Sequence, residues 1–244
     1  MGKSFKIENF KKKIACIIPA KGKSFGLPNK NMLKINNKPL VSYPINIAKR
    51  SKCIINDNIF INTDSERITI YVNKLGNFVK FKRPNYLAKK YSLINDVLLH
   101  NISWFEKNDL KFEHIVLLEP TSPLTNFRDL DKAIKLYIKS GADSLVSVCK
   151  SIREHTNYNF ILSKKKYLMP NFNHNIKNRQ SLSKEYYLDG SFYIFNIKKF
   201  IKNKDIITKK TIGYQIDKKY SYEIDDKLDF ICVEAILKKL NDKK

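Results

Sequence analysis

Short apolar runs alternate with segments of helical spacing along most of the chain. The strand-like runs occupy residues 14–18, 58–62, 78–81 (the weakest), 115–118, 144–149, 191–195 and 212–216. Helical spacing occurs at 39–50, 65–76, 92–105, 129–139 and 198–201, and a last helix follows Asp226. The run at 14–18 lacks polar alternation, which is typical of a strand buried on both faces. This order predicts an α/β fold with a mostly parallel, three-layer sheet and ligands at the carboxyl ends of its strands.

The regular pattern stops between residues 151 and 186, where Asn, Lys and His are frequent. A long irregular stretch inside a compact domain is usually functional or part of an interface. We therefore expect a single domain over residues 1–244 with an excursion at 151–186.

Composition narrows the class of protein. The chain has 244 residues, 43% of them hydrophobic, enough for one α/β domain with a substantial core. No apolar run approaches the roughly 20 residues of a membrane span, and the lysine-rich start lacks the apolar core of a signal peptide, so we expect a cytoplasmic protein. The four cysteines, Cys16, Cys53, Cys149 and Cys232, form no C-x-x-C pair, which favours buried thiols over disulfides or a zinc site.

The formal net charge of +24 raises the possibility of a nucleic-acid-binding protein. However, only six of the 47 basic residues are Arg, and the lysines are spread over the whole length rather than concentrated in one footprint. The charge is equally compatible with small anionic substrates. Nucleic-acid binding remains the alternative from another class of protein, and we expect neither a nucleic-acid nor a membrane partner.

The loop after the first strand is the first candidate site. Pro19 ends the strand, and Lys21, Gly22, Lys23, Ser24, Gly26 and Lys30 follow it. Such a loop can turn backbone N–H groups toward an anion while its lysines add positive charge. It is neither a P-loop nor a G-x-G-x-x-G loop, and an ordinary basic surface loop is the alternative.

The same loop resembles a known family. The string IPAKGKSFGLPNKN is similar to the signature A-R-x-x-S-x-G-[IL]-P-x-K-N of the CMP-sialic acid synthetases, or acylneuraminate cytidylyltransferases. The chain departs from that signature at Lys21, where the family usually carries Arg. The matching positions are Ala20, Ser24, Gly26, Leu27, Pro28, Lys30 and Asn31.

Further stretches resemble the same family in the same order. Residues 62–66 are similar to S-T-D-S-E, residues 83–96 to R-P-x-x-L-A-x-D-x-[ST]-x-x-x-D, and residues 117–124 to L-L-Q-P-T-S-P-L. Arg179 and Gln180 match an R-Q pair that precedes an N-G-[AS]-[IF]-Y-[IF] strand, here beginning at Asp189. Residues 223–225 resemble D-I-D. The departures are Lys90 for Asp, Glu119 for Gln, Asp189 for Asn and Glu223 for Asp.

The resemblance implies a set of site residues. Lys21 and Asp225 would be catalytic, and Glu223 and Asp225 would hold Mg²⁺, because alternation along a strand puts both carboxylates on one face. The nucleotide would contact Lys21, Gly22, Ser24, Lys30, Asn31, Arg83 and Ser92. The sugar would contact Glu119, Thr121, Ser122, Arg179, Gln180, Tyr187 and Asp189.

Simpler interpretations exist for several of these residues. Residues 62–66 and 223–226 could merely cap helices, Ser122 could belong to a rigid turn, and Arg179 could be a surface residue. The resemblance nevertheless implies a cytidylyltransferase that activates a nine-carbon 2-keto sugar acid with CTP, for cell-surface polysaccharide biosynthesis, in a homodimer built through the excursion. The nearest alternative is a CMP-Kdo-type or other sugar nucleotidyltransferase of the same fold.

Overall fold

A computed structural model describes residues 2–24, 26–151, 155–170, 180 and 182–241. Its principal sheet has six strands in the order β10-β6-β9-β5-β1-β4. The pairs β1–β4, β1–β5 and β6–β10 are parallel, whereas β9 is antiparallel to both β5 and β6. The strands are β1 (Ile14–Pro19), β4 (Ile59–Asn62), β5 (His114–Leu117), β6 (Ser144–Lys150), β9 (Tyr186–Asn196) and β10 (Thr211–Gln215).

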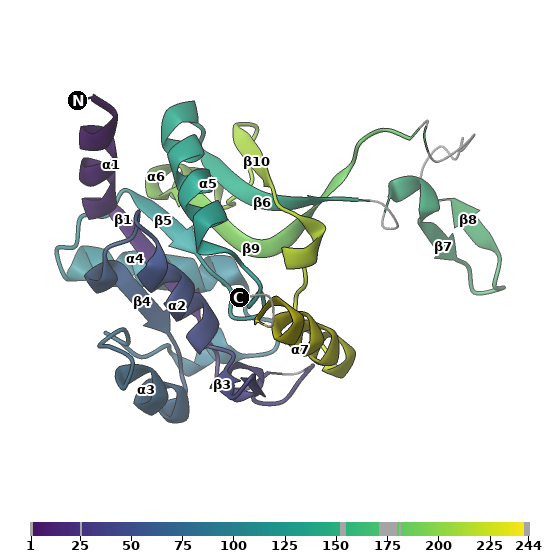
Figure 1. Cartoon of the computed structure of the whole chain (residues 1–244), viewed down its shortest axis with the longest axis horizontal. Helices are drawn as coiled ribbons and strands as arrows, with labels where there is room; N and C mark the ends of the chain where they lie inside the picture. Colours follow the sequence, from purple (N-terminus) through teal and green to yellow (C-terminus); the bar gives the residue numbers. More distant parts are fainter. Residues whose placement is uncertain (1, 25, 152–154, 171–179, 181, 242–244) are drawn as a thin grey trace.

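Helices cover both faces of this sheet, which confirms the α/β prediction (Figure 1). Successive side chains of β1 enter different cores: Ile14, Cys16 and Ile18 pack with one cluster, and Ala15 and Ile17 with the other. The first core receives side chains of α2, α3 and α5, and the second those of α4 and α6. The helices are α1 (Gly2–Lys12), α2 (Ser42–Arg50), α3 (Glu66–Asn73), α4 (Ile94–Lys107), α5 (Phe127–Ser140), α6 (Ile197–Asn203) and α7 (Lys227–Asn241).

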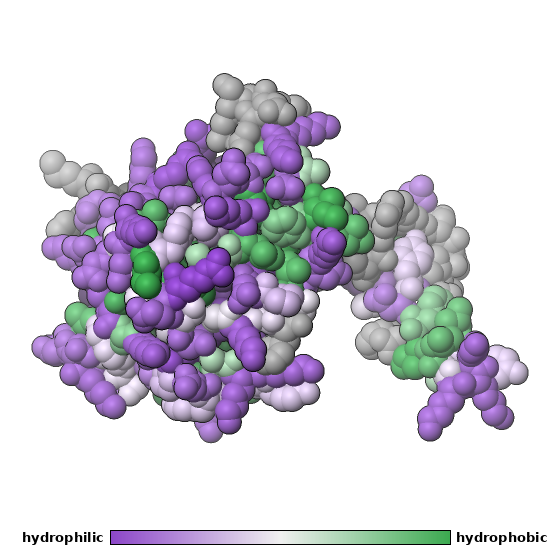
Figure 2. Space-filling view, turned by 90° about the horizontal axis from the view of Figure 1, so that it is seen from below, coloured by the Kyte–Doolittle hydropathy of each residue, from purple (hydrophilic) through white to green (hydrophobic). Residues whose placement is uncertain are grey.

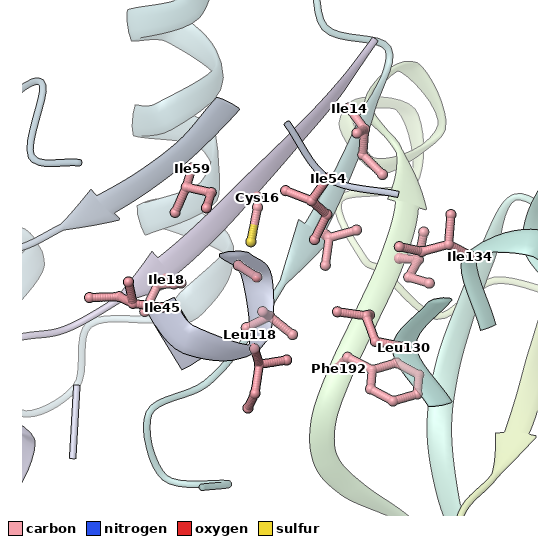
Figure 3. Packing of buried hydrophobic residues seen from close by; sticks show 14 of the residues in the cluster. Ile14, Cys16, Ile18, Ile45, Ile54, Ile59, Leu118, Leu130, Ile134 and Phe192 are labelled. Atoms are coloured by element: carbon pink, nitrogen blue, oxygen red, sulfur yellow. The ribbon is translucent and has the colours of Figure 1, made fainter. Parts of the chain in front are cut away.

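The first core shows why the 14–18 run carries no polar residue. Ile14, Cys16 and Ile18 are fully buried beneath Ile45 of α2 and beside Ile59 of β4 (Figure 3). A strand with a helix layer on each face must be apolar on both. The strand is therefore an interior strand, flanked by β4 and β5, and the segment after it leaves the sheet at the carboxyl edge.

The helices begin where the sequence offers caps. The Ser65 side chain accepts from the backbone N–H of Ile68 and opens α3, and Asn126 caps α5 through the N–H of Arg128. Gly141 ends α5 in the left-handed region, at φ 63°, where glycine has no steric penalty. Residues 62–66 thus do contain a helix cap, as the simpler interpretation held.

Several sequence expectations were wrong in detail. Residues 78–81 form no strand, although the N–H of Ile61 donates to the carbonyl of Phe78 and Thr63 bridges Lys82. Glu223 and Asp225 lie in an irregular segment rather than on a strand. The helix expected from residue 92 begins at Ile94, the strand expected at 191–195 begins at Tyr186, and α1 was not expected.

The excursion contains regular structure. Within it, β7 (Phe160–Leu162) and β8 (Leu168–Pro170) pair as an antiparallel hairpin that stands away from the sheet (Figure 1). A second two-stranded unit, β2 (Lys34–Ile35) with β3 (Lys38–Pro39), precedes α2. In the described part of the chain, no helix is both long and apolar enough to cross a membrane.

Candidate active site

A pocket of about 230 Å³ opens at the carboxyl ends of β1 and β5. Ligands of open α/β sheets bind at this edge, where the strand order reverses. A wider hollow of about 710 Å³ adjoins it and shares Leu87, Lys89 and Ser92 with it. The smaller pocket is lined by Pro19, Lys21, Ser24, Lys30, Asn31, Arg83, Leu87, Lys89, Ser92, Ile94, Val97, Glu119, Pro120 and Thr121.

Four cationic side chains line this pocket: Lys21 and Lys30 from the lysine loop, Arg83 and Lys89. Partial burial lowers the pKa of Lys21 below its ordinary value, and the charges of Arg83 and Lys30 lower it further. Like charges placed this close repel one another unless an anion joins them. The pocket is therefore built to receive a polyanion.

The lysine loop is tied down by neighbouring side chains. Asn31 donates its side-chain amide to the carbonyl of Lys21 at 2.8 Å. The N–H of Gly22 donates to Asp64 at 2.8 Å, and a Cβ at Gly22 would lie 2.7 Å from the Cβ of Ser65. Only glycine allows this close approach, so the loop and residues 64–65 form one rigid wall.

Arg83 is almost completely buried beneath this wall, at 3% exposure. Its Nε donates to the side-chain oxygen of Asn62, and one terminal nitrogen donates to the Asn62 carbonyl at 2.9 Å. Desolvation lowers the pKa of Arg83 to about 10, which leaves the guanidinium charged at neutral pH.

Four carboxylates lie next to the cations. Burial, followed by the charges of Glu119, Asp225 and Asp189, raises the pKa of Glu223 to about 7. Burial also raises the pKa values of Glu119 and Asp189. Asp225 is 77% exposed and pairs with Lys30 at 3.0 Å. A cation would relieve the mutual repulsion of these groups.

Backbone contacts join the segment 223–225 to the loop after β5. The N–H of Ile224 donates to the Thr121 carbonyl at 2.9 Å, and Lys30 Nζ donates to the Ile224 carbonyl at 2.6 Å. Gly190 has φ 68°, and a Cβ there would overlap the Glu223 carboxylate. Contacts from Thr121 and Lys30 thus hold the irregular segment at the pocket edge, although it forms no β-strand pairing.

Comparison with known proteins decides the family. A sequence profile of the family described as "Cytidylyltransferase" matches residues 15–240. The chain belongs to this family. It is therefore a nucleotidyltransferase, as the motif resemblance implied.

Individual relatives are similar over most of this cytidylyltransferase. "Post-translational flagellin modification protein B" of Campylobacter coli is 32% identical over 93% of this chain and 96% of its own. "CMP-N,N'-diacetyllegionaminic acid synthase" of Campylobacter jejuni is 31% identical over 92% and 94%. "N-acylneuraminate cytidylyltransferase" of Streptococcus agalactiae is 32% identical over 89% of this chain, which spans only 52% of that protein.

A solved structure agrees with the fold. The structure of CMP:2-keto-3-deoxy-manno-octonic acid synthetase complexed with CTP matches with a TM-score of 0.69 at 13% identity, covering 93% of this chain and 99% of that one. At this identity the likeness concerns the fold alone.

The cytidylyltransferase brings many predicted site residues together. Lys21, Ser24, Lys30, Asn31, Arg83, Ser92, Glu119 and Thr121 all line the pocket of 230 Å³. Asp225 is joined to the pocket by its ion pair with Lys30. Glu223 lies beside the pocket, where the charges of Glu119 and Asp189 act on it.

Other predicted residues are used differently or lie elsewhere. The Gly22 N–H donates to the Asp64 carboxylate. Ser122 is buried and donates to the Gly190 carbonyl at 3.1 Å. The Tyr187 hydroxyl contacts Ser221 at 3.0 Å, and Gln180 is exposed. Arg179 lies outside the described residues.

Sequence reasoning missed Lys89 and Asn62. Lys89 lines the pocket but lies in a run of lysines that gave no reason to single it out. Asn62 sits at the end of β4, where a polar residue directly after an apolar run was the signal available; it was attributed to the helix cap that follows.

Proposed function

We propose that this cytidylyltransferase transfers CMP from CTP to a nine-carbon 2-keto sugar acid, an N-acylneuraminate or a legionaminate-like analogue, and releases pyrophosphate. The observation that carries the proposal is the juxtaposition of four cationic side chains and a carboxylate cluster at one sheet edge. The name of the legionaminic acid synthase, a relative that matches 92% of this chain, supports the substrate class.

The cations would bind the triphosphate. Lys21, Lys30 and Arg83 face one pocket, and Ser24, Asn31 and Ser92 offer hydroxyl and amide groups on its walls. Phosphoryl and nucleotidyl transfer depend mostly on positioning and charge neutralisation, so these residues suffice without a covalent nucleophile.

The carboxylates would hold a hard cation. Glu223 and Asp225 are the residues that we assign to Mg²⁺; burial and the neighbouring carboxylates raise the pKa of Glu223, and a bound cation would oppose that shift. The described residues contain no group of three or more His, Cys, Asp or Glu side chains arranged for a metal. Mg²⁺ commonly takes one or two carboxylates together with substrate phosphate oxygens and water. When bound, the ion would supply Lewis-acid polarisation of the phosphate.

The sugar acid would lie on the side of β9. Glu119, Thr121 and Asp189 offer hydrogen-bonding groups there, with Ser122 fixing Gly190 and Tyr187 fixed by Ser221. Arg179 and Gln180 are assigned to the sugar carboxylate by the motif resemblance, since a guanidinium holds a carboxylate through two parallel hydrogen bonds.

The direct test is pyrophosphate release with CTP, ATP, GTP and UTP against a panel of nine-carbon 2-keto acids and Kdo. We expect turnover with CTP and a nine-carbon acid only, and none after magnesium is chelated. Preference for Kdo would favour the alternative sugar nucleotidyltransferase, and turnover with another nucleotide would overturn the proposal.

A further inference from the structure

Asn62 connects the lysine loop to Arg83, two cationic parts of the pocket wall. It is fully buried at the end of β4, and its carbonyl accepts from both Arg83 and the N–H of Ala20, each at 2.9 Å. Ala20 begins the lysine loop, and the backbone N–H of Arg83 donates to the neighbouring Thr63 carbonyl at 2.8 Å. One residue thus fixes the start of the loop and the guanidinium relative to each other.

The orientation of the Asn62 amide follows from chemistry. A guanidinium carries donors and no acceptor, so the side-chain oxygen of Asn62 must face Arg83 Nε. The amide nitrogen is then buried and finds no hydrogen-bond partner among the described residues. A buried donor without an acceptor is unfavourable. An aspartate at this position would accept the same bond, carry no orphaned N–H and neutralise a buried cation.

Asparagine at position 62 therefore stabilises the fold less than aspartate would, and it leaves the neighbouring buried cation without a counter-charge. Arg83 makes no ion pair within 4.0 Å in the described part of the chain, although Asp64 acts on it from farther away. Burial of an unpaired charge is costly. The charge is left for whatever enters the pocket that Arg83 shares with Lys21 and Lys30.

We propose that Asn62 is a positioning residue that aims the Arg83 guanidinium at the pocket while leaving its charge free for the phosphate groups of the substrate. The identity of that polyphosphate as CTP rests on the proposed function above. The positioning role requires only that the pocket bind a polyphosphate.

The test is Asn62→Asp, which keeps the hydrogen-bond acceptor and adds one negative charge. Binding of CMP, CTP and inorganic tripolyphosphate would be measured by calorimetry in the absence of metal, alongside Tm. We expect affinity for CTP and tripolyphosphate to fall at least about tenfold, and that for CMP by less, because the lost attraction scales with ligand charge. Tm should be unchanged or higher than in the wild type.

Asn58→Asp is the matched control, because it adds the same charge just before β4, at the opposite edge of the sheet. The Asn58 side chain donates to the carbonyls of Lys11 and Ile14, at 3.2 and 3.1 Å. Its replacement should lower Tm and leave polyphosphate affinity unchanged.

The outcomes separate the two proposals. Unchanged tripolyphosphate affinity in Asn62→Asp, an equal loss for CMP and CTP, or a Tm as low as that of Asn58→Asp would overturn the positioning role. So would failure of the wild type to bind tripolyphosphate. Loss of tripolyphosphate affinity in Asn62→Asp, combined with no CTP turnover by a wild type that binds tripolyphosphate, would support the positioning role and refute the proposed function.

Discussion

Lys21 shows how a single departure from a family motif can be tested. It lines the pocket next to Lys30 and Arg83, whereas Lys23 two positions later is exposed and absent from the pocket wall. Lysine is a mobile point charge, whereas arginine can bridge two phosphate oxygens through its planar fork. Positive charge is kept in either case, so the loop can retain its role with weaker geometric control.

We expect Lys21→Ala to lower kcat/KM for CTP by about 10- to 100-fold, the equivalent of one charge-assisted hydrogen bond. Lys21→Arg should lose less and can improve CTP affinity. Steady-state kinetics of both variants would be compared with Lys23→Ala, which should resemble the wild type because its side chain points to solvent. Wild-type kinetics in Lys21→Ala would show that Lys21 does not bind the triphosphate, and would favour the alternative of an ordinary basic surface loop.

Asp225 carries the prediction about metal. It is exposed, paired with Lys30, and followed by Asp226, whose carboxylate accepts from the N–H of Asp229 at the start of α7. Asp225→Asn should reduce turnover by at least about 100-fold, since stabilisation of charge by a bound metal is worth several kcal/mol. The fold should survive because the Asp225 side chain is exposed. Circular dichroism and Tm would check this.

Asp226→Asn is the control for Asp225→Asn. It removes one neighbouring charge, but asparagine can still cap the helix. Magnesium titrations of activity should therefore separate the two variants. Equal activity of Asp225→Asn and the wild type would show that the resemblance of residues 223–225 to D-I-D is misleading.

At the scale of elements, β5 carries a half-buried histidine at the end remote from the site. His114 packs against the rings of Phe10 and Tyr137, and its Nδ1 lies 3.0 Å from the Tyr137 hydroxyl. Burial lowers the pKa of His114 to about 4; Glu113 opposes the shift and Lys13 adds to it. The folded protein therefore holds this imidazole neutral where the unfolded chain, with its ordinary pKa near 6.5, begins to bind a proton.

The sign of the pH effect follows from proton linkage. Between about pH 6.5 and 4 the unfolded state binds more protons, so stability is complete above pH 6.5 and is lost as pH falls toward 4. His114 should account for about 2 kcal/mol of the loss in unfolding free energy between pH 7 and pH 5. The free energy of unfolding in urea would be measured against pH for the wild type and for His114→Phe, which keeps an aromatic ring. The difference between the two pH slopes gives the contribution of His114. Parallel pH profiles would contradict the assignment.

The elements that could be predicted are those whose burial leaves a clear pattern. The run at 14–18 became β1 because both faces of that strand are covered, and the acids, hydroxyls and lysines that follow strands did gather at one edge. The direction of β9 was not predictable, since an apolar run reads the same in either direction. Helix α1 was missed because its sequence, GKSFKIENFKK, is largely polar; Phe10, near its end, packs against the first core.

The missed features of the site are tertiary. Segment 223–225 needs no strand partner because Thr121 and Lys30 bind its backbone, and no local pattern encodes contacts across 103 or 194 positions. Asn62 was attributed to the cap of α3, since the sequence cannot show that Arg83 returns beneath it. In both cases the residue type was visible in the sequence and its partner was not.

At the scale of the whole molecule, the hairpin β7–β8 is an apolar surface held away from the core. Phe160, Ile161, Leu162, Tyr167, Leu168 and Met169 are between 41% and 71% exposed. They gather in a green patch on the projecting arm (Figure 2). An isolated two-stranded hairpin is at best marginally stable in water, and contiguous exposed apolar patches usually mark interaction sites. We take this as support for the homodimer that the resemblance implied, with the arm as the contact.

The last prediction is that the arm controls the oligomeric state. The double variant Leu162→Ser/Leu168→Ser removes two apolar side chains that are 63% and 67% exposed and pair across the hairpin. Because neither belongs to a described core cluster, the sheet should keep its Tm while the dimer dissociates to monomers. Sedimentation equilibrium would be compared with Leu136→Ser, which removes a 41% exposed leucine from α5 and should leave the dimer intact. A wild-type protein that sediments as a monomer, or a double variant that remains dimeric, would refute the role of the arm. A monomer that keeps full turnover would show that each subunit carries a complete active site, because no group from a second copy would then be needed.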